Sequence, residues 1–312
     1  MCEIMIIKQQ LKGSALLTLC ALIWGSAFVA QSTAMQYVEA FTFQSARSFL
    51  GAIVLLPWAL LRRKFALVQR RDKKTFLKAG ISCGVVLCAA SCLQQFGIYF
   101  NDRAAANAGT VTDGAVVGKA GFITALYILL VPLFGLFFKK KAGGNVWLGV
   151  GVALCGLYLL CMTGKTRPDF GDILVFFSAV FFAVQILLVD RFIDTVDGVA
   201  LSCFQFAVVG VLSGVGMLLF EHPSLPAICG AWREILYAGV LSSSIAYTLQ
   251  ILGQKYTPPT LASMLMSLES VFAVLAAALL LGQIPTAVQI VGCVLMFAAI
   301  VLAQLPNKKK AE

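Results

Sequence analysis

The sequence has few charged residues and a single histidine. Only 12% of its 312 residues are charged, and 60% are hydrophobic. A soluble globular chain carries roughly 25% charged residues. This deficit, with a mean hydropathy of +0.91, excludes an ordinary soluble domain and indicates an integral membrane protein. Because His222 is the only histidine, the sequence also argues against a catalytic site or proton relay built on histidine.

The cysteines are unsuited to a metal site or a disulfide framework. Eight of the ten lie within apolar runs, where a free cysteine behaves as a small hydrophobe. Cys88 and Cys92 share a helix face, but no histidine or carboxylate accompanies them. A zinc site needs four ligands, or three and a water. We therefore expect no metal, no cofactor and no enzymatic centre.

Acidic residues are also scarce, at 14 against 24 lysines and arginines, which gives a net charge of +10. The basic residues lie in short segments between apolar runs, so they point to a lipid bilayer and not to nucleic acid as the partner. If the N-terminus is cytoplasmic, 18 of the 24 face the cytoplasm and four face the other side. This bias predicts a multi-pass protein of the cell membrane with both termini in the cytoplasm.

Ten apolar runs, each close to the length of about 20 residues that crosses a bilayer, follow one another with short connections. We therefore predict an all-α membrane protein with ten transmembrane helices. The runs cover residues 13–34, 40–61, 77–100, 116–138, 146–163, 173–189, 199–220, 235–254, 257–283 and 286–304.

The two halves of the chain resemble each other. LQQFGIYF (93–100) matches LQILGQKY (249–256), and AGFITALYILLVP (120–132) falls on ASMLMSLESVFAV (262–274). Five spans per half is an odd number, so the second half runs opposite to the first, as in many secondary transporters. We predict two inverted five-helix repeats, residues 13–164 and 170–305. The first half has an insertion, residues 101–115, which we expect to form a surface loop on the non-cytoplasmic side.

The ninth run contains one carboxylate near its middle, Glu269, among small residues. An ionisable group inside a membrane span is costly and is usually functional. Burial favours a neutral carboxyl group and a nearby cation favours the charged form, so its protonation would change as a cavity opens. Glu269 is therefore a candidate for binding a substrate ammonium group or a proton, with a structural role between helices as the alternative. The repeat alignment pairs it with Tyr127, either as a second site residue or as a packed aromatic.

Two cations lie in or at the edge of predicted spans. Arg47, inside the second run, could hold a substrate carboxylate, pair with Glu269, or bind carbonyl groups at a helix end. Lys119 lies near the non-cytoplasmic end of the fourth run. It is a candidate site residue, and snorkelling of its ammonium group to the membrane interface is the alternative.

Uncharged polar and aromatic side chains at membrane depth complete the candidate site. Gln95 and Tyr247 suit hydrogen bonding to a polar solute, although bonds between helices explain them almost as well. Trp24 offers an aromatic wall, with packing alone as the alternative. Pro132 and the pair Pro258–Pro259 are candidate bend points for a conformational change.

Five segments together are similar to EamA-type transporters of the drug/metabolite transporter superfamily. They are IWGSAFVAQ (23–31), the Arg47 region, LQQFGIYF (93–100), KAGFITALYILLVP (119–132) and SLESVFAVLAAALLLGQ (267–283). The resemblance extends over nearly the whole chain. It implies ten transmembrane helices in two inverted EamA repeats, a central cavity lined by both repeats, and peripheral fifth and tenth helices. Members of this family move small metabolites, often outward.

We therefore predict a secondary transporter, an exporter of amino-acid-like or amine-like metabolites that works by alternating access. Coupling to protons and assembly as a monomer or a homodimer are left open. A membrane-embedded sensor or enzyme is the alternative, but the sequence offers no soluble domain, metal-ligand set or nucleophile–base pair. A channel is also disfavoured, because no span carries a glycine-rich re-entrant loop. Saturable counterflow would separate a carrier from a channel, and turnover without transport would support an enzyme.

Overall fold

The computed structural model describes residues 2–65, 73–107, 114–137, 142–161, 169–281 and 284–305. Every regular element within these ranges is a helix. The elements are α1 (Cys2–Ala34), α2 (Ala40–Phe65), α3 (Lys73–Asn107), α4 (Gly114–Ala125), α5 (Tyr127–Phe137), α6 (Gly144–Cys161), α7 (Phe170–Phe192), α8 (Gly198–Phe220), α9 (Leu225–Gly230), α10 (Trp232–Leu236), the π-helix η1 (Tyr237–Ala246), α11 (Tyr247–Gln254), α12 (Pro259–Met266), α13 (Glu269–Leu281) and α14 (Ala287–Gln304).

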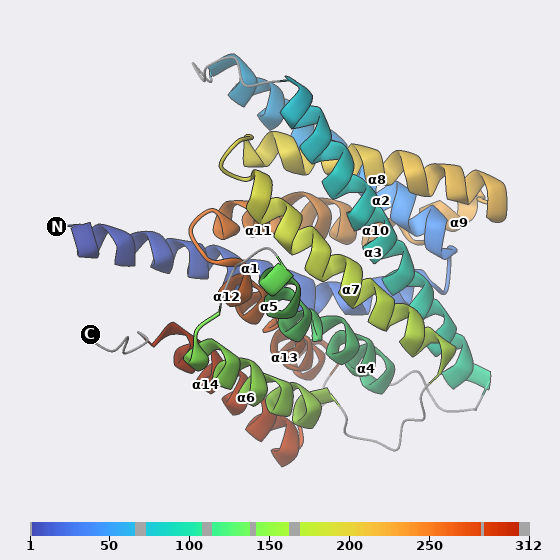
Figure 1. Cartoon of the computed structure of the whole chain (residues 1–312). Helices are drawn as coiled ribbons and strands as arrows, with labels where there is room; N and C mark the ends of the chain where they lie inside the picture. Colours follow the sequence, from blue (N-terminus) through green and yellow to red (C-terminus); the bar gives the residue numbers. More distant parts are fainter. Residues whose placement is uncertain are drawn as a thin grey trace.

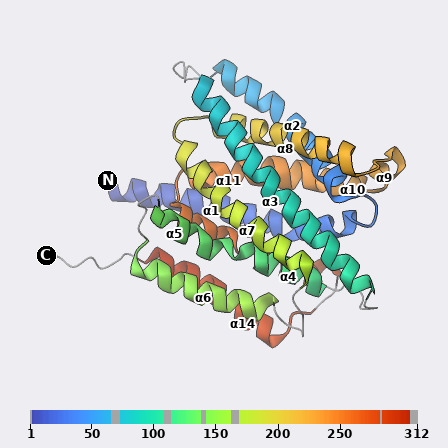
Figure 2. The ribbon, with the colours of Figure 1, turned by 45° about the vertical axis from the view of Figure 1, so that its right-hand side comes forward.

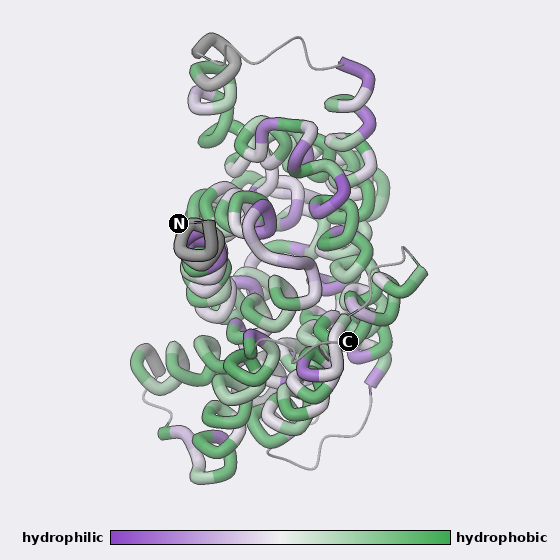
Figure 3. Tube along the Cα trace, turned by 60° about the vertical axis from the view of Figure 1, so that its left-hand side comes forward, coloured by the Kyte–Doolittle hydropathy of each residue, from purple (hydrophilic) through white to green (hydrophobic). Residues whose placement is uncertain are grey.

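The prediction of an all-α membrane protein with ten spans is confirmed. Among the described residues, nine helical segments are long and apolar enough to cross a membrane, and a shorter apolar helix, Gly144–Leu160, supplies the tenth. Helices suit the bilayer because all backbone hydrogen bonds are made within the segment. Large hydrophobic side chains such as Leu218, Leu219 and Phe220 are exposed on the outside of the bundle, where lipid would contact them. Figure 3 shows hydrophobic residues along most of the helices and hydrophilic residues mainly near their ends and in the interior.

The bundle has two ends, which we name from the chain termini. The terminal face is the end where α1 begins and α14 ends (Figure 1). The distal face is the opposite end, where α1 ends, α2 begins, α3 ends and α7 begins. Successive spans alternate in direction between these two faces.

The contacts between helices follow an inverted repeat. The second helices of the two halves, α2 and α8, pack together, and so do the fifth, α6 and α14. These two pairs lie at opposite edges of the bundle in both ribbon views (Figures 1 and 2). The third helix of the first half, α3, packs on α7, and the third span of the second half packs on α1 through α11. The predicted peripheral position of the fifth and tenth spans is therefore observed.

Glycines allow the closest of these contacts. Gly97 of α3 and Gly171 of α7 face each other: a Cβ atom on Gly171 would lie 2.5 Å from the Gly97 carbonyl oxygen. The equivalent contact in the other half joins Gly253 of α11 and Gly13 of α1, where a Cβ atom on Gly13 would lie 3.0 Å from the Gly253 carbonyl oxygen. Gly97 and Gly253 are matched residues in the two repeats, so the same close packing occurs twice.

One local prediction is corrected, and another stays a prediction. Residues 101–107 were expected in a surface loop, but they continue α3 to Asn107, because the alanine-rich segment extends the helix beyond the apolar run. The rest of the predicted loop up to residue 113 lies outside the described part of the chain. The bend points expected at Pro132 and Pro258–Pro259 remain predictions. Pro132 lies within α5, and Pro259 is the first residue of α12, a position where its missing N–H does no harm.

Candidate functional site

The fourth and ninth spans are each broken near the middle of the span. Leu126 separates α4 from α5, and Ser267 and Leu268 separate α12 from α13. At both breaks the backbone makes i→i−3 hydrogen bonds in place of the i→i−4 bonds of an α-helix, from Leu126 N to Ile123 O and from Ser270 N to Ser267 O. Ser267 also donates its hydroxyl to the Met264 carbonyl oxygen at 2.8 Å, a local bond that competes with the helix. Broken helices are tolerated at membrane depth where they line a cavity inside the protein.

Tyr127 and Glu269 meet at these breaks. Each is the first residue of the second half of its broken span, and each is 3% exposed. The Tyr127 hydroxyl donates a hydrogen bond to Glu269 Oε1 at 3.1 Å. The N-terminus of α13 also favours a negative charge at Glu269, because the positive end of the helix dipole lies there. Matched residues of the two repeats thus contact each other in the middle of the bundle.

A small cavity of about 30 Å³ lies beside this pair. It takes side chains from helices of both repeats, and aromatic rings make up much of its wall. Trp24 and Tyr247 pack edge to face with their ring centroids 4.7 Å apart. The residues that line it are Trp24, Phe28, Gln31, Arg47, Gln94, Thr124, Tyr127, Phe182, Ser242, Tyr247 and Glu269.

Arg47 brings a buried cation to the same cavity. It is 4% exposed, and its Nη1 donates to Gln31 Oε1 at 3.3 Å. Its Nε has no hydrogen-bond partner, and no carboxylate within the described ranges forms an ion pair with it. A guanidinium group buried without an anion is costly. A direct pair between Arg47 and Glu269, one of the three possibilities raised by the sequence, is therefore not formed, although both side chains reach one cavity.

Five of the seven residues singled out from the sequence line the cavity: Trp24, Arg47, Tyr127, Tyr247 and Glu269. Gln95 does not. It is fully buried, and its Nε2 donates to the Gln31 carbonyl oxygen at 3.3 Å. It therefore contacts α1 next to a cavity residue without reaching the cavity.

Lys119 also lies elsewhere, at the distal face. Snorkelling is the alternative explanation, but the residue is only 7% exposed and its ammonium group lies 2.5 Å from Asp172 Oδ2. An ion pair with an acid at the start of α7 holds it inside the bundle. The apolar run around Lys119 gives no sign of this pair, because the two acids, Asp169 and Asp172, lie 50 and 53 positions away, before the sixth apolar run.

Several cavity residues were missed from the sequence. Phe28 and Gln31 follow Trp24 at i+4 and i+7, so one face of α1 carries all three, and this helical spacing could have indicated them. Ser242 could not be predicted from the sequence for another reason. It belongs to η1, the π-helix in the middle of the eighth span, and a π-turn changes which side chains face inward. Such turns are frequent at functional sites.

Comparisons with known proteins agree with this architecture. The model of the EamA-like transporter family matches residues 11–162 and 169–305. Two proteins of Archaeoglobus fulgidus, each described as an uncharacterized transporter, are similar to the chain. One is 27% identical over 294 residues, an alignment that covers 93% of this chain and 84% of the length of that protein. The other is 21% identical over 303 residues, which are 93% of this chain and 96% of its own.

A protein of known crystal structure has the same fold. It superposes with a TM-score of 0.72 at 18% identity, over 93% of this chain and 96% of its own. At that identity the likeness concerns the fold alone.

Proposed function

The chain belongs to the EamA-like transporter family, and from this premise we propose that it exports small zwitterionic solutes, such as amino acids, by alternating access. Its family makes it a membrane transporter of the drug/metabolite type, which implies a carrier and not an enzyme. The identity of the solute, the direction of transport and the coupling to protons are parts of the proposal.

One observation carries the choice of solute. A buried carboxylate from the second repeat, Glu269, and a buried guanidinium from the first, Arg47, line one cavity without forming an ion pair. A zwitterion supplies both missing charges. Its ammonium group would lie near Glu269 and the Tyr127 hydroxyl, and its carboxylate near Arg47, which suits carboxylates geometrically. The rings of Trp24 and Tyr247 would add favourable contact with the ammonium group.

The same arrangement supports alternating access. The cavity of about 30 Å³ has room for little more than water, so the repeats must separate to admit an amino acid. Breaks in α4–α5 and α12–α13 provide two places where the helices can change direction. Both breaks lie at the cavity, so movement there would change the site itself.

We place the terminal face in the cytoplasm and the chain in the cytoplasmic membrane. Support comes from the sequence, in which 18 of the 24 basic residues fall in the termini and connections predicted on the side of the two chain ends, in keeping with the positive-inside rule. Export as the direction rests on the resemblance to a family whose members often move metabolites outward. Proton coupling would use Glu269, the one acid among the cavity residues, since acids inside membrane spans commonly serve proton pathways.

Counterflow in proteoliposomes tests this function. Vesicles loaded with an unlabelled amino acid should accumulate the labelled solute through the native protein, saturably, and a panel of amino acids and small amines identifies the best solute. Glu269→Gln should reduce the exchange by about tenfold or more, because a charge-assisted hydrogen bond contributes about 1.5–3 kcal/mol. Glu39→Gln removes an exposed acid and should leave exchange unchanged.

Each result has a clear meaning. Loss of exchange in Glu269→Gln alone supports the cavity as the site, and a pH-gradient effect lost with it supports proton coupling. Normal exchange in Glu269→Gln would remove the carboxylate from the mechanism. Chemical conversion of a solute without its movement would instead favour a membrane-embedded enzyme.

A further inference from the structure

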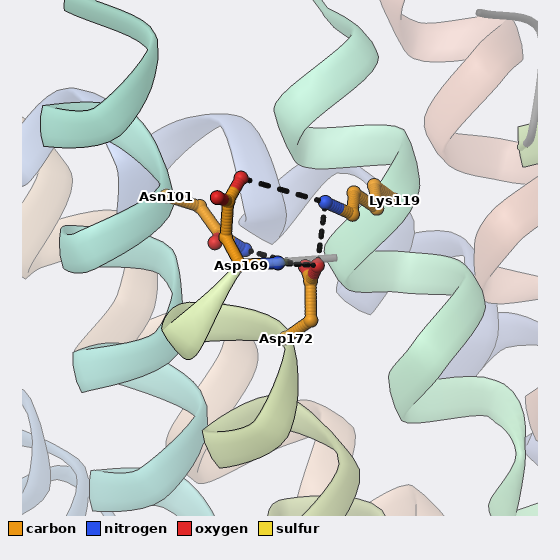
Figure 4. A network of polar contacts seen from close by, with 4 residues as sticks. All are labelled: Asn101, Lys119, Asp169 and Asp172. Atoms are coloured by element: carbon orange, nitrogen blue, oxygen red, sulfur yellow. Dashed lines mark hydrogen bonds and ion pairs between the residues drawn. The ribbon is translucent and has the colours of Figure 1, made fainter. Parts of the chain in front are cut away.

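A cluster of charged and polar side chains joins the two repeats at the distal face (Figure 4). Lys119 Nζ of α4 lies 2.5 Å from Asp172 Oδ2 and 3.8 Å from Asp169 Oδ2. Asn101 of α3 donates through Nδ2 to Asp172 Oδ1 at 3.1 Å. α3 and α4 belong to the first repeat and α7 to the second, so these contacts cross between the halves.

The cluster is buried, although it lies at an end of the bundle. Lys119, Asp172 and Asn101 are 7%, 8% and 4% exposed. Asp172 also accepts the backbone N–H of Asp169 at 2.7 Å and so caps the start of α7. Both of its carboxylate oxygens are used, and parting it from Lys119 would leave a buried charge without its partner, which is costly. These contacts therefore oppose any movement that opens the bundle at the distal face.

The inverted repeat allows a direct comparison with the terminal face. Gly97 matches Gly253, so four residues further on Asn101 matches Thr257, and Lys119 matches Leu261. The packing supports this match. A Cβ atom on Gly171 would lie 2.2 Å from Asn101 Oδ1, and one on Gly13 would lie 2.3 Å from Thr257 Oγ1.

The chemistry of the terminal face is different. Leu261 has no charge. The Thr257 hydroxyl and the matched Asn101 Oδ1 are both buried without a hydrogen-bond partner, but Asn101 also donates through Nδ2 to a carboxylate. The nearby contact of Lys12 Nζ with the Tyr256 ring, 5.2 Å from its centroid, belongs to an exposed lysine and is weak in water. A pocket of about 350 Å³ lies beside it, with Thr257 and Gln254 in its wall. The wall of this pocket also carries Asp190, Asp194 and Lys255, so the difference between the faces concerns the matched contact itself. At the distal face an ion pair holds that contact, whereas at the terminal face Leu261 replaces the lysine.

We propose that the Lys119–Asp172–Asn101 cluster is a gate that holds the distal face closed, so that this transporter rests open toward its terminal face. The proposal rests on the alternating access described above. Movement of solute to the distal side would require Lys119 to leave Asp172, whereas closing the terminal face breaks no ion pair in the matched contact. The unequal ends would give the carrier a preferred resting state.

Hydrogen–deuterium exchange of the full chain in lipid nanodiscs tests the gate. Lys119→Met and Asp172→Asn should raise the population open at the distal face by about tenfold, in line with loss of a charge-assisted bond. Peptides from the distal ends of α4 and α7 should then exchange about tenfold faster. Peptides from the α11–α12 junction at the terminal face should exchange more slowly, because the two open states exclude each other. Arg103→Gln is the matched control, since this distal cation is exposed and stacks on Tyr99 of its own helix.

The pattern of exchange separates a gate from a purely structural contact. If both variants speed exchange at the distal face and leave the terminal face unchanged, the pair merely stabilises local packing and the gate is refuted. Asp172→Asn keeps the shape of the side chain, so it serves if Lys119→Met does not fold.

The exchange measurement needs no solute, so it can fail independently of the proposed function. Normal counterflow with no shift in either variant would refute the gate and leave the transporter. Opposite shifts at the two faces without counterflow of any solute would support two alternating states and refute the proposed solutes.

Discussion

The contact between α1 and the start of α13 should tolerate no side chain at Gly25. A Cβ atom there would lie 2.6 Å from the Glu269 carbonyl oxygen and 2.8 Å from the Ala273 amide nitrogen. Both are backbone atoms, so Gly25→Ala must push the two helices apart by about 0.8 Å to reach ordinary contact. Overpacking of this kind costs about 1–3 kcal/mol, a factor of about 5–150 in the unfolding equilibrium. Since α13 begins with Glu269, the displacement should also move the carboxylate away from Tyr127.

Thermal unfolding and counterflow of the same preparations would measure both effects. Gly25→Ala should melt below the native protein and exchange solute more slowly. Gly121→Ala is the matched control, because it lies in α4 near the same cavity and its added Cβ would meet nothing closer than Ser270 Oγ at 3.9 Å. Equal melting temperatures for Gly25→Ala and the native protein would refute the packing on which the site depends.

Two further predictions concern single hydrogen-bonding groups. Glu221, at the end of α8, accepts hydrogen bonds from the backbone N–H groups of Phe41 and Thr42 at 2.7 Å each, so it caps α2 from the other repeat. Glu221→Gln should therefore destabilise the protein by about 1–3 kcal/mol. A melting temperature equal to that of Glu39→Gln would contradict this prediction. Tyr127→Phe removes only the hydroxyl that donates to Glu269. The apparent affinity for the solute in counterflow should fall about 2- to 10-fold, as for loss of one net hydrogen bond, with little change in the melting temperature. An unchanged affinity would show that the Tyr127 hydroxyl is not part of the binding site.

The course of the chain through the membrane could be predicted because hydropathy and charge bias report it directly. Ten apolar runs became ten spans, and matching segments in the two halves indicated the repeats. The same alignment paired Tyr127 with Glu269, residues that the structure joins by a hydrogen bond. Symmetry was therefore informative even where no single motif was.

Local geometry was harder to predict. Hydropathy does not distinguish a continuous helix from α12 and α13 broken at Ser267, nor an α-helix from the π-helix η1, because all are apolar. Lys119 was misjudged since its partner Asp172 is 53 positions away, in the next repeat. Glu221 was overlooked because its ligands are backbone N–H groups of α2, which carry no signature in side-chain identity.

The most direct test of the central claim is a comparison of three solutes that differ only in charged groups. The native protein should prefer an amino acid over both the amine that lacks its carboxylate and the acid that lacks its ammonium group. Arg47→Gln should lose the preference for the carboxylate alone, and Glu269→Gln the preference for the ammonium group alone, while Arg191→Gln, at an exposed position, keeps both. If both cavity variants weaken all three solutes equally, Arg47 and Glu269 do not hold opposite ends of the solute, and the account is wrong.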